Sequence, residues 1–304
     1  MDLSIVIVSW NVEKLLASCL DSIYSSPPRC SFDIWVVDNA STDGTPGMVR
    51  ERYPQVRLIE NQHNMGFAAA NNQAIRKCAG SYVLLLNPDT VVCPDALNGL
   101  MDHLETHPRA GAAGPRLLNP DGSLQYSCSP APTLWTETRR LIHFPGTRHD
   151  GTYEMSTWDP SRIRQVEVLL GACLLLRREA LQTVGLLDEN FFVYSEEVDL
   201  CYRLLKAGWL SYWVPQAEVV HYGGQSTRQV APEMFYQLYR GKVLYFRKHR
   251  GAFSALIYKF ILFGASLARV VAGFFFWLLR DARRRPLLNL VKNYRRLLVA
   301  LPKL

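Results

Sequence analysis

The sequence predicts an α/β protein in which helices flank a mainly parallel sheet, followed by a basic, amphipathic helical tail. Two observations support this fold class. Over residues 3–90, short apolar runs typical of buried parallel strands alternate with helical patterns. After residue 227, long apolar helical stretches carry most of the positive charge. A chain of 304 residues can form one large domain with an appendage, which we place at 1–226 and 227–304.

Four strands and three helices are expected in the first part of the chain. The strands are the apolar runs 3–8, 34–37, 56–59 and 82–86. The helices are expected from Leu15 to Ile23, after Pro46, and from Phe67 to Cys78, where Gly80 would occupy the C′ position. Repeated strand, helix, strand units with short connections predict right-handed crossovers, so these strands end at one edge of the sheet.

The middle of the chain, residues 111–226, is less regular. The Asn119–Gly122 segment predicts a turn between strands at 112–118 and 122–128. A short helix is expected near 135–142, and the apolar run 166–176 is interpreted as one strand, in which Gly171 would let a ligand approach the backbone. A last short strand is expected before His221.

Polar residues follow each of the four expected strands. Ser9 follows the first strand, Asp38 and Asp43 the second, Asn64 the third and Asp89 the fourth. In open α/β sheets this edge binds ligands, and a carboxylate there can contact a metal ion or a sugar hydroxyl. The alternative is that these residues only form turns and helix caps. A dinucleotide site is not expected, because no Gly-x-Gly-x-x-Gly follows the first strand.

A second polar cluster comes near residue 196. The aromatic run 191–194 precedes Glu196 and Glu197 and could exclude water from one carboxylate, making it a base. The alternative is a helix start in which Ser195 is the N-cap and the acids interact with the helix dipole. Further along, Asp199 and Arg203 have the spacing of a structural ion pair.

His221 is the last polar residue of interest before the tail. It stands beside Gly223 and Gly224, a pair that would suit a closing loop. A lone histidine at a strand end is more often a hydrogen-bonded structural residue than a ligand.

The tail differs in charge from the rest of the chain. From Arg228 onward, 16 Lys and Arg stand against 2 Asp and Glu, a net charge of +14, which leaves −7 for residues 1–227. The apolar stretch 260–279 has basic residues on both sides, so a helix lying in the cytoplasmic leaflet is favoured over a span. A second amphipathic helix is expected after Pro286. The alternative is a helical cap on the protein's own core.

Several other classes are disfavoured. No RNA- or DNA-binding motif accompanies the basic residues, so a nucleic-acid partner is not expected. Seven scattered cysteines without a Cys-x-x-Cys pair indicate reduced thiols in the cytosol rather than a disulfide framework or a zinc site. No secretory signal is expected, because the first strand already begins at Leu3.

Taken in order, five motifs of the chain resemble those of family 2 of the inverting glycosyltransferases, which have the GT-A fold. They are Val36–Thr45, Asn64–Ala68, Leu86–Thr90, Glu196–Leu200 and Val220–His221. Within that family the chain is similar to bacterial rhamnosyltransferase-like members that build polysaccharides such as O-antigen and cell-wall glycans on lipid carriers. The resemblance covers residues 3 to about 226, and it implies a donor half at about 1–110 and an acceptor half at about 111–226.

The resemblance implies a donor site at the ends of the strands. Asp38 and Asp43 would hold the nucleotide base and ribose, with backbone near Ser9, and Asn64 and Gly66 would form part of the floor under the donor.

The resemblance also implies a divalent metal, Mg²⁺ or Mn²⁺, on the donor diphosphate. Asp89 matches the last carboxylate of the family's Asp-x-Asp motif, and His221 matches a further metal ligand of some relatives. Asn87 replaces the first Asp of the motif, so the metal site would depend more on the substrate diphosphate. Glu197 stands at the position of the catalytic base in place of the usual Asp, and Glu196 is the alternative base.

The expected function is therefore a metal-dependent, inverting transfer of a sugar from a nucleotide diphosphate donor to a lipid-linked saccharide on polyprenyl diphosphate. L-rhamnose from a dTDP donor is the expected sugar. The expected location is the cytoplasmic face of the inner membrane, with peripheral or monotopic attachment to an anionic surface. Two alternatives are a nucleotidyltransferase that makes nucleotide sugars and a catalytically silent subunit that binds a saccharide or recruits a partner.

Overall fold

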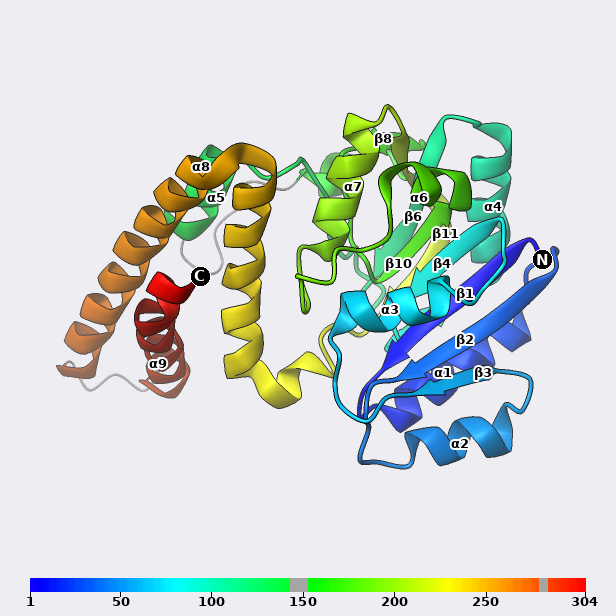
Figure 1. The fold of residues 1–304 in the computed structure, drawn as a ribbon, viewed down its shortest axis with the longest axis horizontal. Coiled ribbons are helices and arrows are strands. Elements are labelled where there is room, and N and C mark those ends of the chain that lie inside the picture. Colours follow the sequence, from blue (N-terminus) through cyan, green and yellow to red (C-terminus); the bar gives the residue numbers. More distant parts are fainter. Residues whose placement is uncertain (143–152, 279–283) are drawn as a thin grey trace. The chain divides into compact units, whose positions relative to one another are not determined.

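The computed structural model describes residues 1–142, 153–278 and 284–304 (Figure 1). The chain divides into two compact units, and each is considered by itself. The first consists of Met1–Ala131, Thr152–Phe192 and Glu196–Gln229. The second consists of Pro132–Gly151, Val193–Ser195 and Val230–Leu304.

The first unit is built on a mixed sheet with strand order β3-β2-β1-β4-β10-β6-β11-β5, and β8 pairs with β11. Its strands are β1 Leu3–Ser9, β2 Phe32–Asp38, β3 Arg57–Glu60, β4 Tyr82–Leu86, β5 Thr90–Val92, β6 Ala110–Leu118, β8 Arg164–Val166, β10 Cys173–Arg177 and β11 Leu210–His221. Strands β1 to β4 are parallel, as predicted. Strand β10 runs antiparallel between β4 and β6, and β11 is parallel to β6.

Helices cover both faces of this sheet (Figure 1). One face packs against α1 Glu13–Ser25, α2 Thr45–Arg52 and α4 Ala96–Thr106, and the other against α3 Phe67–Ile75, α6 Arg178–Val184 and α7 Glu196–Lys206. The side chains of a strand alternate between its faces. In β1, Leu3, Ile5 and Ile7 therefore contact the first group of helices, while Val6 and Val8 contact the second. The result is a three-layer architecture with β1 and β4 buried in its centre.

The interpretation of residues 166–176 as one strand is wrong. The run contains the end of β8, then β9 Val168–Leu169, and then β10. Strand β8 pairs with β11, β9 pairs with β7 Cys128–Ser129, and β10 pairs with β4 and β6. Val166 at the end of β8, both residues of β9 and most of β10 are apolar and buried, so composition did not reveal the changes of partner. The expected strand 122–128 is also mostly absent, with one isolated bridge from Leu124 to Leu118.

Three local predictions are wrong. Helix α3 ends at Ile75, so Gly80 is not its C′ residue. A Cβ at Gly80 would lie 2.6 Å from Ser4 N, so the glycine permits a close approach to β1. Ser195 has a φ of 72°, not the extended backbone of an N-cap, and the strand ending at His221 has 12 residues and is not short.

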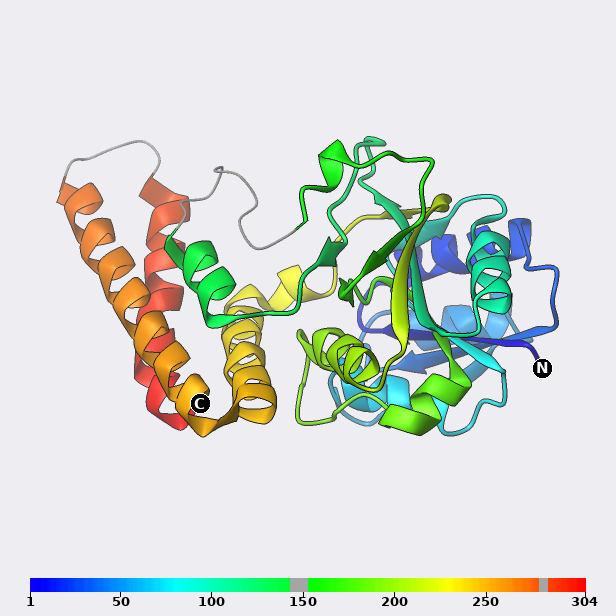
Figure 2. The ribbon, with the colours of Figure 1, turned by 90° about the horizontal axis from the view of Figure 1, so that it is seen from above.

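The second unit is helical and contains α5 Leu134–Ile142, α8 Ala231–Leu278 and α9 Arg284–Ala300, which ends in the 3₁₀ turn Leu301–Lys303 (Figure 2). Helix α8 is broken at Gly251, whose φ of 84° and ψ of 166° are not helical. Helix α9 lies alongside the part of α8 beyond this break (Figure 2). The second amphipathic helix is thus confirmed, although it begins two residues before Pro286.

A buried ion cluster joins α5 to α8 within this unit. Glu137 has no exposed side-chain surface and is paired with Lys242 and Arg140. Burial alone would raise the pKa of Glu137, but the two cations outweigh it and the pKa is lowered. Arg269 donates to the Leu141 carbonyl and lies over the Tyr294 ring, so the one charge within the apolar stretch 260–279 has a structural role.

Candidate active site

The carboxyl ends of β1 and β2 bring Ser9 and Asp38 side by side, because the two residues are paired in register. Both side chains are buried. One oxygen of Asp38 accepts a hydrogen bond from Ser41 N at 2.9 Å, while its Oδ1 and the Ser9 hydroxyl have no hydrogen-bond partner in the described part of the chain. Buried polar atoms are nearly always satisfied, so two neighbouring orphans indicate a position where a ligand supplies the partners.

Asp43 lies at the same edge but has protein partners for both carboxylate oxygens. One accepts from Glu13 N at 3.1 Å and the other from Thr45 N at 3.1 Å and from the Thr45 hydroxyl. Burial would raise the pKa of Asp43, but these hydrogen bonds lower it. Asp43 therefore fixes the first residues of α1 and α2, a role that the helix-cap alternative anticipated.

The predicted floor residues are organised by a side chain that sequence analysis did not single out, Asn39. Its amide nitrogen donates to Asn64 Oδ1 at 2.8 Å, and Asn64 Oδ1 also accepts from Gly66 N at 2.9 Å. Gly66 has a φ of 81°, and a Cβ there would lie 2.5 Å from the Phe192 carbonyl oxygen. Phe67 N donates to that oxygen at 2.6 Å, so this turn is tied directly to the segment that leads to Glu196.

The structure brings Asn87, Asp89 and His221 together from opposite ends of the first unit's sequence. His221 Nε2 lies 3.3 Å from Asp89 Oδ1 and 3.3 Å from Asn87 Nδ2, and both Asp89 and His221 are buried. Burial alone would raise the pKa of Asp89, but the contact with His221 lowers it. On the other side of the ring, His221 Nδ1 lies 2.7 Å from Gln125 Oε1. Gln125 carries no motif in the sequence, so only the fold identifies it.

The orientation of Gln125 decides which histidine nitrogen carries the proton. Its amide nitrogen faces two acceptors, the His221 carbonyl at 3.1 Å and Asn119 Oδ1 at 2.9 Å, so its oxygen must face His221. Nδ1 is therefore a donor, which leaves Nε2 as the nitrogen that faces the Asp89 carboxylate and the Asn87 amide. In a neutral ring this nitrogen carries the lone pair that a metal ion needs.

This donor set fits a divalent metal that the substrate completes. A carboxylate, an imidazole nitrogen and an amide are all metal ligands, and Mg²⁺ is commonly held by one or two carboxylates together with substrate phosphates. In the part of the chain that the structure describes, no group of three or more His, Cys, Asp and Glu side chains forms a complete protein-only site. Asp89 and His221 would therefore hold the ion jointly with the phosphates of a ligand.

Glu196 and Glu197 begin α7 in different environments. Glu196 is buried, and its pKa is raised well above the usual value by burial and then by the neighbouring Glu197 charge. Glu197 is half-buried. Tyr194 and Ser195, just before them, have φ values of 67° and 72°, a left-handed conformation that costs energy in non-glycine residues and is concentrated at functional sites. The predicted pair Asp199–Arg203 is a structural ion pair at 2.8 Å.

A short segment connects the acid pair to the Asn87 side of the site. Asn87 N donates to the Ala172 carbonyl at 2.8 Å, and a Cβ at Gly171 would contact Glu197 Cβ at 3.4 Å. The sequence predicted that Gly171 would let a ligand approach the backbone, and the structure places the Glu197 side chain beside it. The contact between Gly171 and Glu197 and the contact between Gly66 and Phe192 bring the Glu196–Glu197 pair to the edge of the sheet that carries Asp38 and Asp89.

Comparison with known proteins supports one family. The profile of Glycosyl transferase family 2 matches residues 4–185. An N-acetylglucosaminyl-diphospho-decaprenol L-rhamnosyltransferase of Mycobacterium tuberculosis H37Rv is 38% identical over 231 residues, covering 71% of this chain and 73% of that protein. The O-antigen biosynthesis protein RfbC of Myxococcus xanthus is 27% identical over 239 residues, covering 77% of this chain and 18% of that protein.

Solved structures support the fold. A mannosyltransferase from Pyrobaculum calidifontis in complex with GDP-Man and Mn²⁺ superposes with a TM-score of 0.59 and 20% identity, covering 99% of this chain and 85% of that one. A GalNAc-T7 structure with UDP, GalNAc and Mn²⁺ gives a TM-score of 0.55 and 16% identity over 73% of this chain and 44% of that one. The profile spans more than half of the chain, and this protein therefore belongs to glycosyltransferase family 2 and has the GT-A fold.

Proposed function

We propose that this glycosyltransferase moves L-rhamnose from a dTDP donor to an N-acetylglucosamine carried on a polyprenyl diphosphate, with inversion at the anomeric carbon. The observation that supports it most is the pairing of two different carboxylate sites on one sheet edge. Asp89 with His221 suits a diphosphate leaving group, and the half-buried Glu197 suits a general base. The choice of sugar and acceptor follows from the name of the 38% identical mycobacterial relative.

In this proposal, Glu197 takes the proton from the acceptor hydroxyl as that oxygen attacks the anomeric carbon of the donor. The attack breaks the bond between that carbon and the diphosphate, which leaves on the opposite face. The raised pKa of Glu196, caused by burial and then by the neighbouring Glu197 charge, favours the neutral form of Glu196, so we assign the negative charge of the pair to Glu197. One carboxylate of the pair is thereby kept available as a base.

On the donor side, Ser9 and Asp38 have free buried oxygens that would accept from the nucleotide base or ribose. Asn64 and Gly66, held by Asn39, would lie beneath the donor. Asp89 and His221, with Asn87 beside them, would hold a divalent cation, Mg²⁺ or Mn²⁺, which stabilises negative charge on the departing diphosphate. The Mn²⁺ complexes of proteins with this fold support a metal here.

Membership of the family disfavours both alternatives drawn from the sequence, the nucleotidyltransferase and the catalytically silent subunit. Replacement of the first Asp of the motif by Asn87 was the best support for a silent subunit. Asn87 instead donates toward His221 Nε2, which keeps it within the site as a neutral partner of that ring.

The second unit would attach the enzyme to the membrane that carries its acceptor. Beyond Gly251, α8 buries one face, with Tyr258, Leu262 and Ser266 fully buried. Its opposite face exposes apolar side chains at helical spacing, Phe253, Leu256, Phe260, Phe263, Leu267 and Val271. An exposed apolar stripe of this length is typical of membrane or partner contact.

This attachment is proposed to be in-plane and on the cytoplasmic face. Among the described residues, Thr227–Gly273 is the one helical segment long and apolar enough to cross a bilayer, with 22% of its most apolar window buried. Its break at Gly251 and its one-sided exposure favour a helix lying in the interface. The basic tail would contact anionic lipids, and the free cysteines suit a reducing compartment.

The proposal is tested by incubating the full-length protein with a panel of nucleotide sugars and a short-chain N-acetylglucosaminyl diphosphate lipid. We expect mass spectrometry to detect the addition of one deoxyhexose from dTDP-rhamnose, and less than a tenth of that rate from other donors. Efficient transfer of another sugar would contradict the donor assignment, while transfer only to acceptors that lack the lipid diphosphate would contradict the acceptor assignment.

A further inference from the structure

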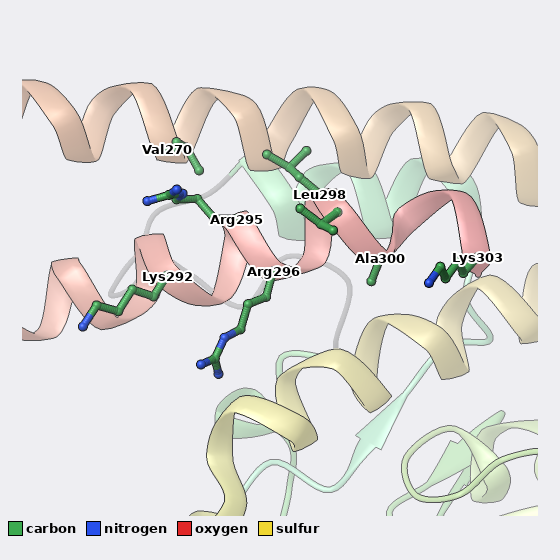
Figure 3. Close-up of a pocket in the computed structure, with 8 residues that line it drawn as sticks. Val270, Lys292, Arg295, Arg296, Leu298, Ala300 and Lys303 are labelled. Atoms are coloured by element: carbon green, nitrogen blue, oxygen red, sulfur yellow. The ribbon is translucent and has the colours of Figure 1, made fainter.

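A groove in the second unit, formed by α8 beyond Gly251 and by α9, is not explained by sugar transfer (Figure 3). Its volume is about 740 Å³. Four cations line it, Lys292, Arg295, Arg296 and Lys303, together with apolar side chains that include Val270, Leu298 and Val299. Lys292 and Arg296, one turn apart, extend to the same side of α9, and Arg295 lies near Val270 (Figure 3). The groove thus combines positive charge with apolar walls.

The described part of the second unit holds few carboxylates, and these are engaged away from the groove. Lys242 and Arg140 are paired with Glu137. Among the described residues of the second unit, the only other carboxylate side chain is Glu233, which accepts from Gln237. No ion pair joins the four groove cations to a carboxylate in the described ranges. Four like charges in one groove repel each other, so the groove is built to be neutralised by an anion from outside.

The walls of the groove indicate what kind of anion this is. Val299 is 80% exposed, and Val270 is followed directly by Val271, the last member of the exposed stripe of α8. Apolar surface therefore continues from the groove into the face that is proposed to enter the membrane. A small hydrophilic anion would leave this surface in water, whereas an anionic lipid would cover it and place its phosphate among the cations.

We propose that this groove is a binding site for the headgroup phosphate of an anionic phospholipid. Lys292 and Arg296, one turn apart on the same side of α9, supply two cationic groups that bind phosphate through charge-assisted hydrogen bonds, and Arg295 adds a guanidinium near Val270 (Figure 3). The site fixes the position of α9 at the headgroup level while the α8 stripe contacts the acyl chains. This groove differs from a diffuse attraction between the +14 tail and anionic lipids. In the groove, the affinity for the lipid depends on four specified side chains and not on the total charge.

The test compares two variants with the same net charge. Arg295→Gln with Arg296→Gln removes two adjacent groove cations, and Arg247→Gln with Lys248→Gln removes two adjacent exposed cations of α8 that do not line the groove. Both are made in the full chain, and unchanged melting temperatures confirm folding. Binding is measured by flotation with two kinds of vesicle, one of phosphatidylcholine alone and one that also contains about 30 mol% phosphatidylglycerol. The second kind has roughly the anionic charge of a natural membrane surface.

We expect the groove variant to lose roughly 30-fold in affinity for the anionic vesicles and the control variant less than about threefold. Equal losses in the two variants would show diffuse attraction and overturn the groove. Glycerol 3-phosphate, added at constant ionic strength, should compete only weakly with the vesicles. If it binds the protein as tightly as the vesicles do, the ligand is a free phosphate and the lipid assignment is overturned.

The lipid site in the groove rests on the proposed membrane attachment, but different results would contradict the two proposals. If the parent protein binds neither kind of vesicle, both the attachment and the groove are wrong. If the parent binds and the groove variant binds equally well, the groove alone is wrong. Sugar transfer to a water-soluble acceptor, measured in parallel, should be the same in all three proteins and reports on the proposed reaction independently.

Discussion

Gln125 Oε1 accepts a hydrogen bond from His221 Nδ1 at 2.7 Å, and this contact turns the other ring nitrogen toward Asp89. The amide of Gln125 cannot be reversed, because its nitrogen already donates to the His221 carbonyl and to Asn119. Partners of this kind fix the tautomer of metal-binding histidines and raise the basicity of the coordinating nitrogen. We therefore expect Gln125 to be a positioning residue for the proposed metal site.

Replacing Gln125 by Ala should weaken metal binding by roughly 10-fold or more, because His221 loses the partner that fixes its proton on Nδ1. Calorimetric titration of Mn²⁺ into the protein in the presence of dTDP measures the metal affinity without turnover. Gln125→Glu keeps the acceptor oxygen but loses the donors to the His221 carbonyl and Asn119, so it should restore the affinity only in part. Equal metal affinity in the Ala variant and the parent would show that Gln125 has only a structural role.

Replacing Glu197 by Gln should reduce kcat by roughly 100-fold or more while donor binding changes little, because the amide keeps the shape and removes the base. Glu196→Gln should have a much smaller effect on kcat, since burial and the neighbouring Glu197 charge raise the pKa of Glu196 and so favour its neutral form. Steady-state kinetics of both variants decide between the two residues. A nearly normal Glu197→Gln enzyme beside an inactive Glu196→Gln enzyme would assign the base to Glu196.

Asp38 and Asp43 should respond differently to substitution, although both belong to one sequence motif. Asp38→Asn changes the charge of a buried group with a free oxygen, and it should raise the donor KM roughly 10-fold. Asp43→Ala removes hydrogen bonds to the starts of α1 and α2, and it should destabilise the fold by about 1 kcal/mol. Donor KM and urea unfolding are measured for both variants. A larger KM effect at Asp43 than at Asp38 would reverse this assignment.

Replacing Glu137 by Gln should destabilise the second unit by about 3 kcal/mol at neutral pH, since it leaves Lys242 and Arg140 without their buried partner. The pKa of Glu137 is lower in the folded protein than its usual 4.5, so its contribution is fully present above about pH 4.5 and is lost as the pH falls through the folded value. Melting curves of parent and variant should therefore converge in acid. A stability difference that persists unchanged at pH 3 would contradict the ion-pair explanation.

The sequence was most informative where chemistry is local. Strands β1 to β4 are continuous apolar runs that end in polar residues, and the periodicity of Leu15–Ile23 marks the buried face of α1. The edge that carries Asp38 and Asp89 could be predicted, because parallel strands joined by right-handed crossovers must end together. The amphipathic nature of α9 was also visible in its spacing of apolar residues.

The sequence was least informative where partners are distant along the chain. Nothing in residues 166–176 shows that the chain changes partner between β8, β9 and β10, because the run is apolar almost throughout. Gln125 contacts His221 across 96 residues, and Asn39 contacts Asn64 across 25, through side chains that also suit ordinary turns. The groove between α8 and α9 depends on how two helices pack, which single-helix patterns do not specify.

The most direct measurement for the whole account is the anomeric configuration of the product. The parent protein is supplied with dTDP-rhamnose, Mn²⁺ or Mg²⁺ and the N-acetylglucosaminyl diphosphate lipid, and the new linkage is determined by NMR. We predict one rhamnosyl residue with the configuration opposite to that of the donor, formed only when metal is present and not by an Asp89→Ala variant. A product that retains the donor configuration, or full transfer in saturating chelator, would contradict the inverting, metal-dependent reaction proposed for Glu197 and Asp89.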